Sequence, residues 1–215
     1  MGDNMNNVLY ERLEKRFGKN EPIFLSEIPD EIKEYSESYV YLLLKEADKE
    51  GKVIKTLKGV YYIPTNTPIG KSEISINQIV EKKYLRNGDE VFGIGGRNIL
   101  DLNFFINTQV PYTIELISNK ETQKVRKYKI EKNTYLIRRS RTTITKDNYA
   151  AYTLCELFNS SEVYKFKIDE NIWDAIIRYI KKEKITKNQI EDLIDYFPKR
   201  SKRYIEESGL YDEIT

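Results

Sequence analysis

The sequence predicts an α+β fold in two domains, and three observations lead to this prediction. The chain has 215 residues, which is enough for two small domains that each bury a core. Apolar residues make up 40% and charged residues 33% of the chain, a composition typical of folded globular proteins. Stretches with helical apolar spacing are interrupted by short runs rich in Val, Ile, Thr and Tyr, so both helices and strands are expected.

The N-terminal part of the chain predicts three successive helices. Apolar side chains recur at helical intervals over residues 4–17, and Gly18 follows as a C-cap. A second, shorter helix is expected to begin near Ser26 and to continue through Ile32. The third helix begins with a serine cap in SESYVYLLLKEADKEG, carries its apolar side chains on one face and ends at Gly51.

A two-stranded hairpin is predicted directly after the third helix. In KVIKTLKGVYYI, the runs VIKT and GVYYI flank a turn through Leu57, Lys58 and Gly59. Three helices followed by such a hairpin is the order of a winged helix-turn-helix, which we assign to residues 1–66. In that fold the third helix enters the major groove of DNA, and the hairpin, called the wing, contacts the flanking backbone.

The residues that would contact DNA lie on the third helix and on the wing. The hydroxyl groups of Ser38 and Tyr39 can donate to bases or phosphates, and Lys45 can reach a phosphate or a guanine edge. Lys55 and Lys58 lie on the wing and at its tip, where we expect them to face phosphate. The wing residues expected to pack inward are Val53, Val60 and Tyr62.

The first domain also permits a second interpretation. Residues 1–70 contain 12 acidic and 10 basic residues, and the third helix contains no arginine. A winged helix with this charge can serve as a protein–protein adaptor that does not bind DNA. Both interpretations stay open for this segment.

The second domain, residues 67–215, is predicted to combine a mixed sheet with C-terminal helices. The polar stretch 64–73, with two prolines and a glycine, is expected to be a linker. Residues 90–141 alternate strand and turn signals, as in a mixed sheet. Helices are expected in residues 75–84, 169–182, 186–197 and 199–208. Capping boxes are predicted for Ser75 with Gln78 and for Thr186 with Gln189.

Basic residues are concentrated in the middle of the chain, although the net charge of the whole is only +2. Residues 71–150 hold 15 basic and 9 acidic residues, whereas residues 151–215 hold 11 and 13. Most of the excess lies in KVRKYKIEKNTYLIRRSRTTITK, residues 124–146, where tyrosines interleave with the cations. This pattern is typical of a surface that faces nucleic acid. It also fits a solvated β-meander with lysines on an edge strand, and both readings stay open.

The residue inventory excludes several classes of catalysis. The chain contains no histidine and one cysteine, so Ser-His-Asp sites, Cys-His sites and zinc sites based on His or Cys are excluded. The cysteine, Cys155, lies in the apolar run YTLCELF and is expected to be an inert core residue. The acidic pairs at 191–192 and 212–213 lie among lysines, as on a solvated helix face. Chemistry on a metal held by carboxylates stays open on this inventory and would need clustered acids. We expect no catalytic residue, no cofactor and no metal.

The glycine-rich stretch FGIGGRN, residues 92–98, invites comparison with a phosphate-binding loop. It lacks the G-x-G-x-x-G spacing, because position 98 is Asn98, and it lacks the G-K-[ST] ending of a P-loop. We expect a tight turn from strand to helix, with glycine required for a positive φ or for close packing.

The chain is expected to act in the cytoplasm and to have no membrane contact. No run approaches the roughly 20 apolar residues that span a bilayer. The N-terminal stretch lacks the uninterrupted apolar core of a signal peptide. Asn6 stands where the myristoylation pattern requires Ser or Thr.

Several of these segments resemble one bacterial family in the same order. The helix SYVYLLLKEADKEGKV, followed by a wing ending in GVYYIP, resembles the N-terminal domain of the AbiEi-type antitoxins of type IV toxin-antitoxin and abortive-infection systems. Residues 91–118 are similar to that family's glycine-containing strand, short helix, Thr-Gln-Val-Pro element (108–111) and strand. Residues 144–158 resemble its later helix, which starts after an asparagine. The resemblance covers roughly residues 5–205.

The resemblance implies an antitoxin that represses its own operon by binding promoter repeats and neutralises a nucleotidyltransferase-like toxin without a stable complex. Family members bind DNA through the winged helix, helped by a positively charged surface on the second domain. The implied partners are double-stranded DNA and the toxin, and we expect a monomer in solution that binds DNA cooperatively. By this analogy the DNA contacts of the first domain are Tyr39, Tyr41, Lys45, Lys55 and Lys58. The implied basic surface consists of Lys124, Arg126, Lys127, Arg138, Arg139 and Arg141.

Overall fold

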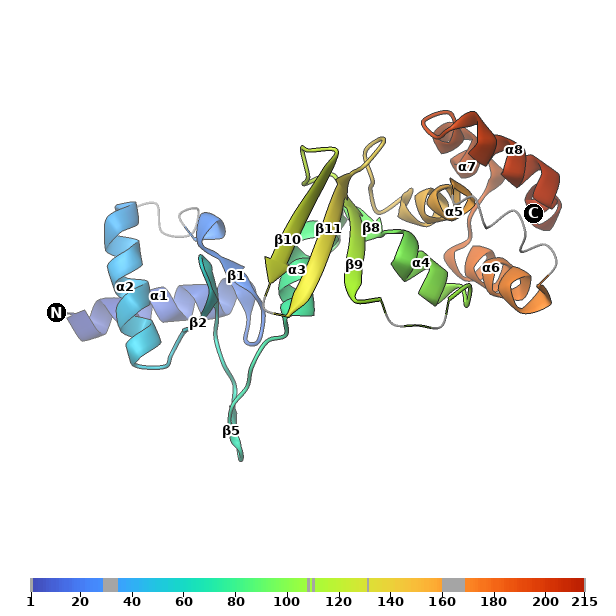
Figure 1. The fold of residues 1–215 in the computed structure, drawn as a ribbon. Coiled ribbons are helices and arrows are strands. Elements are labelled where there is room, and N and C mark those ends of the chain that lie inside the picture. The colour runs from blue at the N-terminus through green and yellow to red at the C-terminus, as the bar shows by residue number, and fades with distance from the viewer. Residues whose placement is uncertain are drawn as a thin grey trace. The chain divides into compact units, whose positions relative to one another are not determined.

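The structure, a computed structural model, has a mixed α+β fold that divides into two compact units (Figure 1). It describes residues 2–28, 35–107, 109, 111–130, 132–159 and 169–214, with side chains from Val8 onward. Unit 1 is Met1–Val80 and unit 2 is Glu81–Thr215. The sequence places the domain boundary after Asn66, whereas the contacts place it within a helix at Val80.

Unit 1 contains two long helices and a small antiparallel sheet. The strand Ile23–Phe24 pairs with one strand of the predicted wing, so the strand order is β1-β3-β2. The expected second helix begins as a short 3₁₀ turn at Leu25–Glu27, and its continuation at 29–34 lies outside the described residues. The elements are α1 (Gly2–Phe17), β1 (Ile23–Phe24), α2 (Glu37–Lys49), β2 (Ile54–Leu57), β3 (Val60–Tyr62), β4 (Asn66–Thr67) and β5 (Gly70–Lys71).

Local chemistry accounts for the helix α2 and the hairpin that follows it. Ser36 caps α2, because its hydroxyl oxygen accepts a hydrogen bond from the backbone N–H of Tyr39. Gly59 occupies the tight turn between β2 and β3 with φ of +73°, a conformation that favours glycine. The predicted inward residues of the hairpin, Val53, Val60 and Tyr62, are buried, and Lys55 and Lys58 are exposed. The hairpin and the burial of these three residues are therefore confirmed, although Val53 packs in a different cluster from Val60 and Tyr62.

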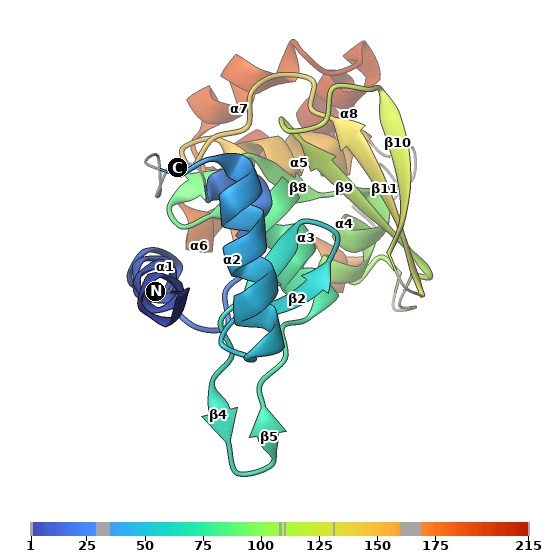
Figure 2. The same ribbon diagram turned by 90° about the vertical axis from the view of Figure 1, so that its left-hand side faces the viewer.

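The expected linker at residues 64–73 is instead a protruding β-ribbon, β4–β5, which extends from unit 1 (Figures 1 and 2). Its base is fixed by hydrogen bonds from the Tyr62 hydroxyl to the carbonyl of Ser72 (2.9 Å) and from Asn20 Nδ2 to Thr65 Oγ1 (2.8 Å). Lys71 Nζ donates to the carbonyl of Gly51 at 2.6 Å. Of the prolines and glycine that suggested a linker, Pro68 lies in the turn at the tip of this ribbon and Gly70 begins β5.

Unit 2 is built on a four-stranded mixed sheet with the strand order β10-β11-β9-β8. Strands β9 and β11 are parallel, and the other neighbouring pairs are antiparallel. The strands of this sheet are β8 (Gly93–Gly95), β9 (Thr113–Ser118), β10 (Val125–Ile130) and β11 (Asn133–Arg139). Strands β6 (Arg86–Asn87) and β7 (Glu90–Val91) form a separate two-stranded sheet. The helices are α3 (Ile76–Tyr84), which crosses the boundary of the units, α4 (Arg97–Asn103), α5 (Tyr149–Asn159), α6 (Glu170–Glu183), α7 (Lys187–Ile194) and α8 (Lys199–Ser208). Both predicted capping boxes are present.

Helices cover both faces of this sheet. Helices α4 and α5 pack on the face that carries Ile94 and Ile117, and the main core of unit 2 lies between them and α6, α7 and α8. The end of α3 packs on the other face, where the ring of Tyr84 lies 5.9 Å from that of Tyr128. In the sheet β11 lies between two other strands, whereas β10 is an edge strand.

The glycine-rich stretch forms the predicted tight turn from β8 into α4, with Gly96 as the N-cap. None of Gly93, Gly95 and Gly96 has a positive φ, so close packing is the reason for glycine here. A Cβ atom at Gly93 would lie 2.1 Å from the carbonyl oxygen of Tyr84. A Cβ at Gly96 would lie 2.6 Å from the Cβ of Glu115.

Cys155 is fully buried in α5, as the sequence predicts, and burial raises the pKa of its thiol to about 12. Because the thiolate is the reactive form, the folded protein is expected not to react with a disulfide reagent at pH 8. In urea high enough to unfold unit 2, one equivalent of thiol per chain should react rapidly. Rapid reaction of the native protein, followed by absorbance of the released thiolate, would contradict this assignment.

Candidate nucleic-acid interface

The basic segment of residues 124–146 forms the antiparallel hairpin β10–β11 and the loop that leads to α5. Lys127 and Lys129 are exposed on one face of the edge strand β10. Arg126 points to the opposite face, where its Nε lies 3.3 Å from the buried carboxylate of Glu121 and its guanidinium lies 5.8 Å from the ring centroid of Tyr128. Arg126 is thus part of an internal ion pair and is a weaker candidate for an external ligand than the lysines.

Four of the predicted cationic residues meet in one surface hollow of about 490 Å³ in unit 2. We call it the arginine hollow. It lies where β11 ends, beside the last turns of α5 and the turn between α7 and α8. The hollow is lined by Lys124, Val125, Arg138, Arg139, Ser140, Arg141, Glu156 and Tyr196.

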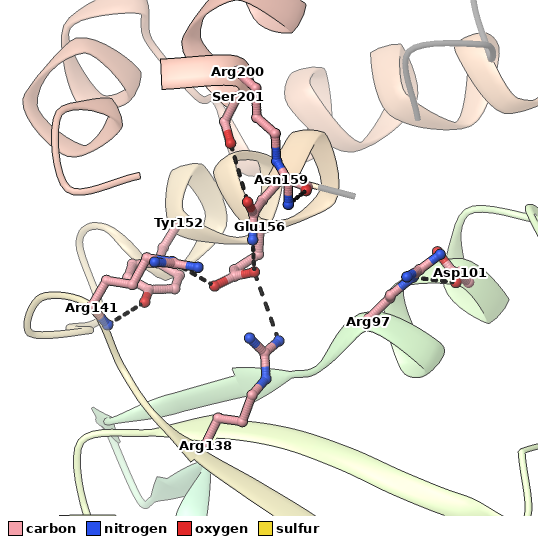
Figure 3. A network of polar contacts seen from close by, with 9 residues as sticks. All are labelled: Arg97, Asp101, Arg138, Arg141, Tyr152, Glu156, Asn159, Arg200 and Ser201. Atoms are coloured by element: carbon pink, nitrogen blue, oxygen red, sulfur yellow. Dashed lines mark hydrogen bonds and ion pairs between the residues drawn. The ribbon is translucent and has the colours of Figure 1, made fainter. Parts of the chain in front are cut away.

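A buried carboxylate orients two of the arginines (Figure 3). The Glu156 side chain is only 4% exposed, and its Oε1 lies 3.3 Å from Nε of Arg141. Its Oε2 lies 3.8 Å from Nη2 of Arg138 and accepts a hydrogen bond from Asn159 Nδ2 at 3.2 Å. Because a buried charge is costly unless it is paired, the carboxylate holds both guanidinium groups in place.

Arg141 is fixed at two further points. Its backbone N–H donates to the hydroxyl of Tyr152 at 2.8 Å, and burial raises the pKa of that hydroxyl to about 12. Its guanidinium lies over the ring of Phe197, 5.3 Å from the centroid. The side chain of Arg141 is still 34% exposed and that of Arg138 is 29% exposed, so both remain accessible from the hollow.

The charges of the arginine hollow favour an anion. Four cations face a single carboxylate, which leaves an excess of three positive charges among the lining residues. A guanidinium carries five N–H donors, so Arg138 and Arg141 keep free donors after contacting Glu156. Planar guanidinium groups with fixed orientation are suited to phosphate oxygens. Among the described residues no group of three or more acidic or cysteine side chains could hold a metal ion.

Unit 1 carries the other predicted contacts. Ser38, Tyr41 and Lys45 are exposed on α2, and Lys55 and Lys58 are exposed on the β2–β3 hairpin. Tyr39 differs from the prediction, because its ring is half-buried against the core of unit 1 and lies 5.5 Å from the ring of Tyr35.

Four residues that line the arginine hollow were not among the predicted contacts, namely Val125, Ser140, Glu156 and Tyr196. Glu156 is the one acidic residue in the otherwise apolar run YTLCELF, and a carboxylate in such a run signals a buried ion pair. Tyr196 gave no comparable signal, because the helical pattern of residues 186–197 includes it as an ordinary helix position. In the structure α7 ends at Ile194, and the turn that follows places Tyr196 at the hollow.

No protein-family model matches the chain, and no curated protein matches its sequence. None of the helices in the described part of the chain is long and apolar enough to cross a membrane.

Proposed function

We propose that the protein is a DNA-binding antitoxin of a bacterial type IV toxin-antitoxin system that represses its own operon from the cytoplasm. In this proposal it binds repeats in its promoter and neutralises a nucleotidyltransferase-like toxin without forming a stable complex. The observation that carries the proposal is the arginine hollow, in which the buried Glu156 holds Arg138 and Arg141 beside two further cations. Such a cluster matches the phosphate contacts that supply much of the affinity for DNA.

The topology of unit 1 supports its assignment as a winged helix-turn-helix. Strand β1 precedes the segment of the expected second helix, and it pairs with β3 at the edge of the hairpin in the order β1-β3-β2. A winged helix has the same arrangement, with its first strand completing the sheet of the wing. In the proposal α2 lies in the major groove, and its exposed side chains Ser38, Tyr41 and Lys45 face the bases and backbone.

The distribution of charge suggests that the two units contribute differently to DNA binding. Residues 1–70 are net acidic, so unit 1 by itself is expected to bind DNA weakly. The basic hairpin and the arginine hollow lie in unit 2 and would supply most of the sequence-independent affinity. In the proposal α2 adds the sequence preference, and a monomer in solution binds neighbouring repeats cooperatively.

Replacing Lys55 and Lys58 by alanine is expected to weaken binding to every duplex alike and to reduce the slope of log K against log salt by up to about 2. Both side chains are exposed and make no ion pair among the described residues, so the fold should be retained. Fluorescence anisotropy over a salt series measures the slope. Lys15→Ala removes an exposed charge from α1 as a control and should leave the slope unchanged.

A reporter gene under the protein's own upstream region tests repression in cells. Reporter expression should fall when the protein is supplied in trans. With the variant that lacks Lys55 and Lys58, expression should stay close to its level without the protein. Neutralisation is tested separately, by co-expression with the nucleotidyltransferase-like gene of the same operon and measurement of growth. Growth rescue without co-purification of the two proteins is the expected result.

One observation favours a second candidate function, a protein–protein adaptor. Helix α2 exposes 48% of Tyr41 and 54% of Leu42, and exposed apolar side chains on an amphipathic helix are typical of protein contacts. The two functions differ in their response to salt, because an adaptor would ignore duplex DNA at physiological ionic strength. Replacing Leu42 by lysine should leave DNA binding intact or strengthen it in the repressor, and should abolish partner binding in an adaptor.

A further inference from the structure

We propose that the arginine hollow also binds an unpaired nucleotide, with the phosphate on the N–H groups of Arg138 and Arg141 that Glu156 does not contact and the base stacked on Tyr196. The hollow brings both kinds of group together, because Tyr196 lines the same concavity as the two arginines. The ligand class is single-stranded nucleic acid, either DNA or RNA, and the nucleotide chemistry is common to both.

The phosphate half of the site is held in advance. Glu156 contacts one nitrogen of each guanidinium, at 3.3 Å for Arg141 and 3.8 Å for Arg138, and the remaining N–H groups stay available. Lys124 and Arg139 are exposed at the same hollow and make no ion pair in the described part of the chain. A phosphate entering here would neutralise part of an existing excess of positive charge.

The base half of the site is an exposed aromatic ring. Tyr196 is 57% exposed, whereas the next residue, Phe197, is buried and packs edge-on against Tyr152 at 5.2 Å. The two adjacent aromatic residues thus have different roles. Phe197 is part of the core and lies under the Arg141 guanidinium, whereas Tyr196 faces solvent. Aromatic rings next to a basic groove are the stacking platforms of proteins that bind single strands.

The combination selects against a duplex. In double-stranded DNA each base is stacked between its neighbours, so its face cannot contact a tyrosine ring. The phosphates of a duplex can contact the exposed lysines of β10. A concave site lined by a tyrosine ring is better suited to a nucleotide whose base is unpaired and unstacked. The inference shares Arg138 and Arg141 with the proposed function, yet it concerns a different ligand and fails separately from it.

The test compares fluorescein-labelled ten-nucleotide oligo-dT and oligo-rU with a labelled duplex, by anisotropy on the full chain. Tyr196→Ala should weaken binding of a single strand about tenfold, the loss of one stacking contact, and leave duplex binding unchanged. Tyr196→Phe should retain binding. Tyr112→Ala removes another exposed tyrosine, 79% accessible, and serves as the matched control.

If the chain binds oligo-dT and oligo-rU with different affinities, the inference is supported, and the more tightly bound oligomer shows whether the ligand is DNA or RNA. An unchanged affinity of Tyr196→Ala for both oligomers would overturn it, as would no detectable binding of either oligomer by the unmodified chain. An equal loss for duplex and single strand would also overturn it, because Tyr196 would then act on the shared phosphate site alone. Absent duplex binding with intact single-strand binding would refute the proposed repressor and leave this inference standing.

Discussion

Replacing Lys124 and Arg139 together by alanine is expected to weaken duplex binding roughly 60-fold at 0.1 M salt and to flatten the salt slope by about 1.8. Each cation that neutralises one phosphate contributes about 0.9 to the slope, and near 0.1 M this corresponds to nearly tenfold in affinity. Both side chains are exposed at the arginine hollow and make no ion pair among the described residues, so their loss should not affect folding. Anisotropy at several salt concentrations gives both quantities.

The matched control removes the same charge elsewhere in unit 2. Lys181 and Lys184 are exposed at the end of α6, and in the described part of the chain they make no ion pair. Replacing both lysines by alanine should flatten the salt slope by less than a quarter of the change expected for the Lys124 and Arg139 double variant. Equal effects of the two double variants would show that net charge, and not the hollow, binds DNA. Arg138 and Arg141 are less suitable targets, because their removal leaves the buried carboxylate of Glu156 unpaired.

Gly93→Ala is expected to destabilise unit 2 by about 3 kcal/mol or more. The added Cβ would lie 2.1 Å from the carbonyl oxygen of Tyr84 and 2.7 Å from that of Ile117, and both obstacles are backbone atoms. Gly93 pairs with Ser118 on β9, so the clash would separate the end of α3 from the sheet or break the pairing of β8 with β9. Because β9 supports β11, the arginine hollow should lose its geometry with the sheet.

Urea denaturation measures this loss, and the exposure of the Cys155 thiol reports unfolding of the same unit. Gly88→Ala is the control, because a Cβ atom at Gly88 would have no atom within 4 Å. The alanine would be strained only by the backbone φ of +57° at this position. That strain costs about 1 kcal/mol. A Gly93→Ala protein as stable as the Gly88→Ala protein would contradict the close packing described for β8.

Local sequence signals identified most of the helices and the first hairpin. Serine and threonine caps and their glutamine partners act within one turn of chain, so Ser36, the Ser75 box and the Thr186 box could be read directly. The β2–β3 hairpin followed from a glycine turn between two β-rich runs. For the same reason the tight turn before α4 could be predicted. The sequence did not show whether its glycines are required for a positive φ or for close packing.

Features that depend on distant contacts could not be predicted. Strand β1 has only two residues, Ile23 and Phe24, and becomes a strand because β3 pairs with it. The ribbon β4–β5 is held by side chains from outside its own segment, Asn20 and Tyr62, so its sequence looked like a linker. The boundary of the units moved to Val80 for a related reason, because Ile74 and Ile79 pack into the core of unit 1.

The candidate site was predicted in part. The sequence identified the cations of residues 124–146 but could not separate those that reach the hollow from Arg126, which is paired internally with Glu121. That separation depends on the alternation of β10 and on the sheet order, which places Arg138 beside α5. Glu156 meets Arg138 and Arg141 only in the folded chain, so the sequence signals a buried carboxylate but does not identify its partners.

Anisotropy of the purified protein with its own upstream region and with a scrambled duplex, over a salt series, tests the central claim most directly. We predict tighter binding to the native region, with an affinity for both duplexes that falls steeply as salt rises. Sequence preference would reflect α2, and the steep common salt dependence would reflect the arginine hollow and the basic hairpin. Absence of binding to either duplex at physiological salt would contradict the repressor and favour the adaptor.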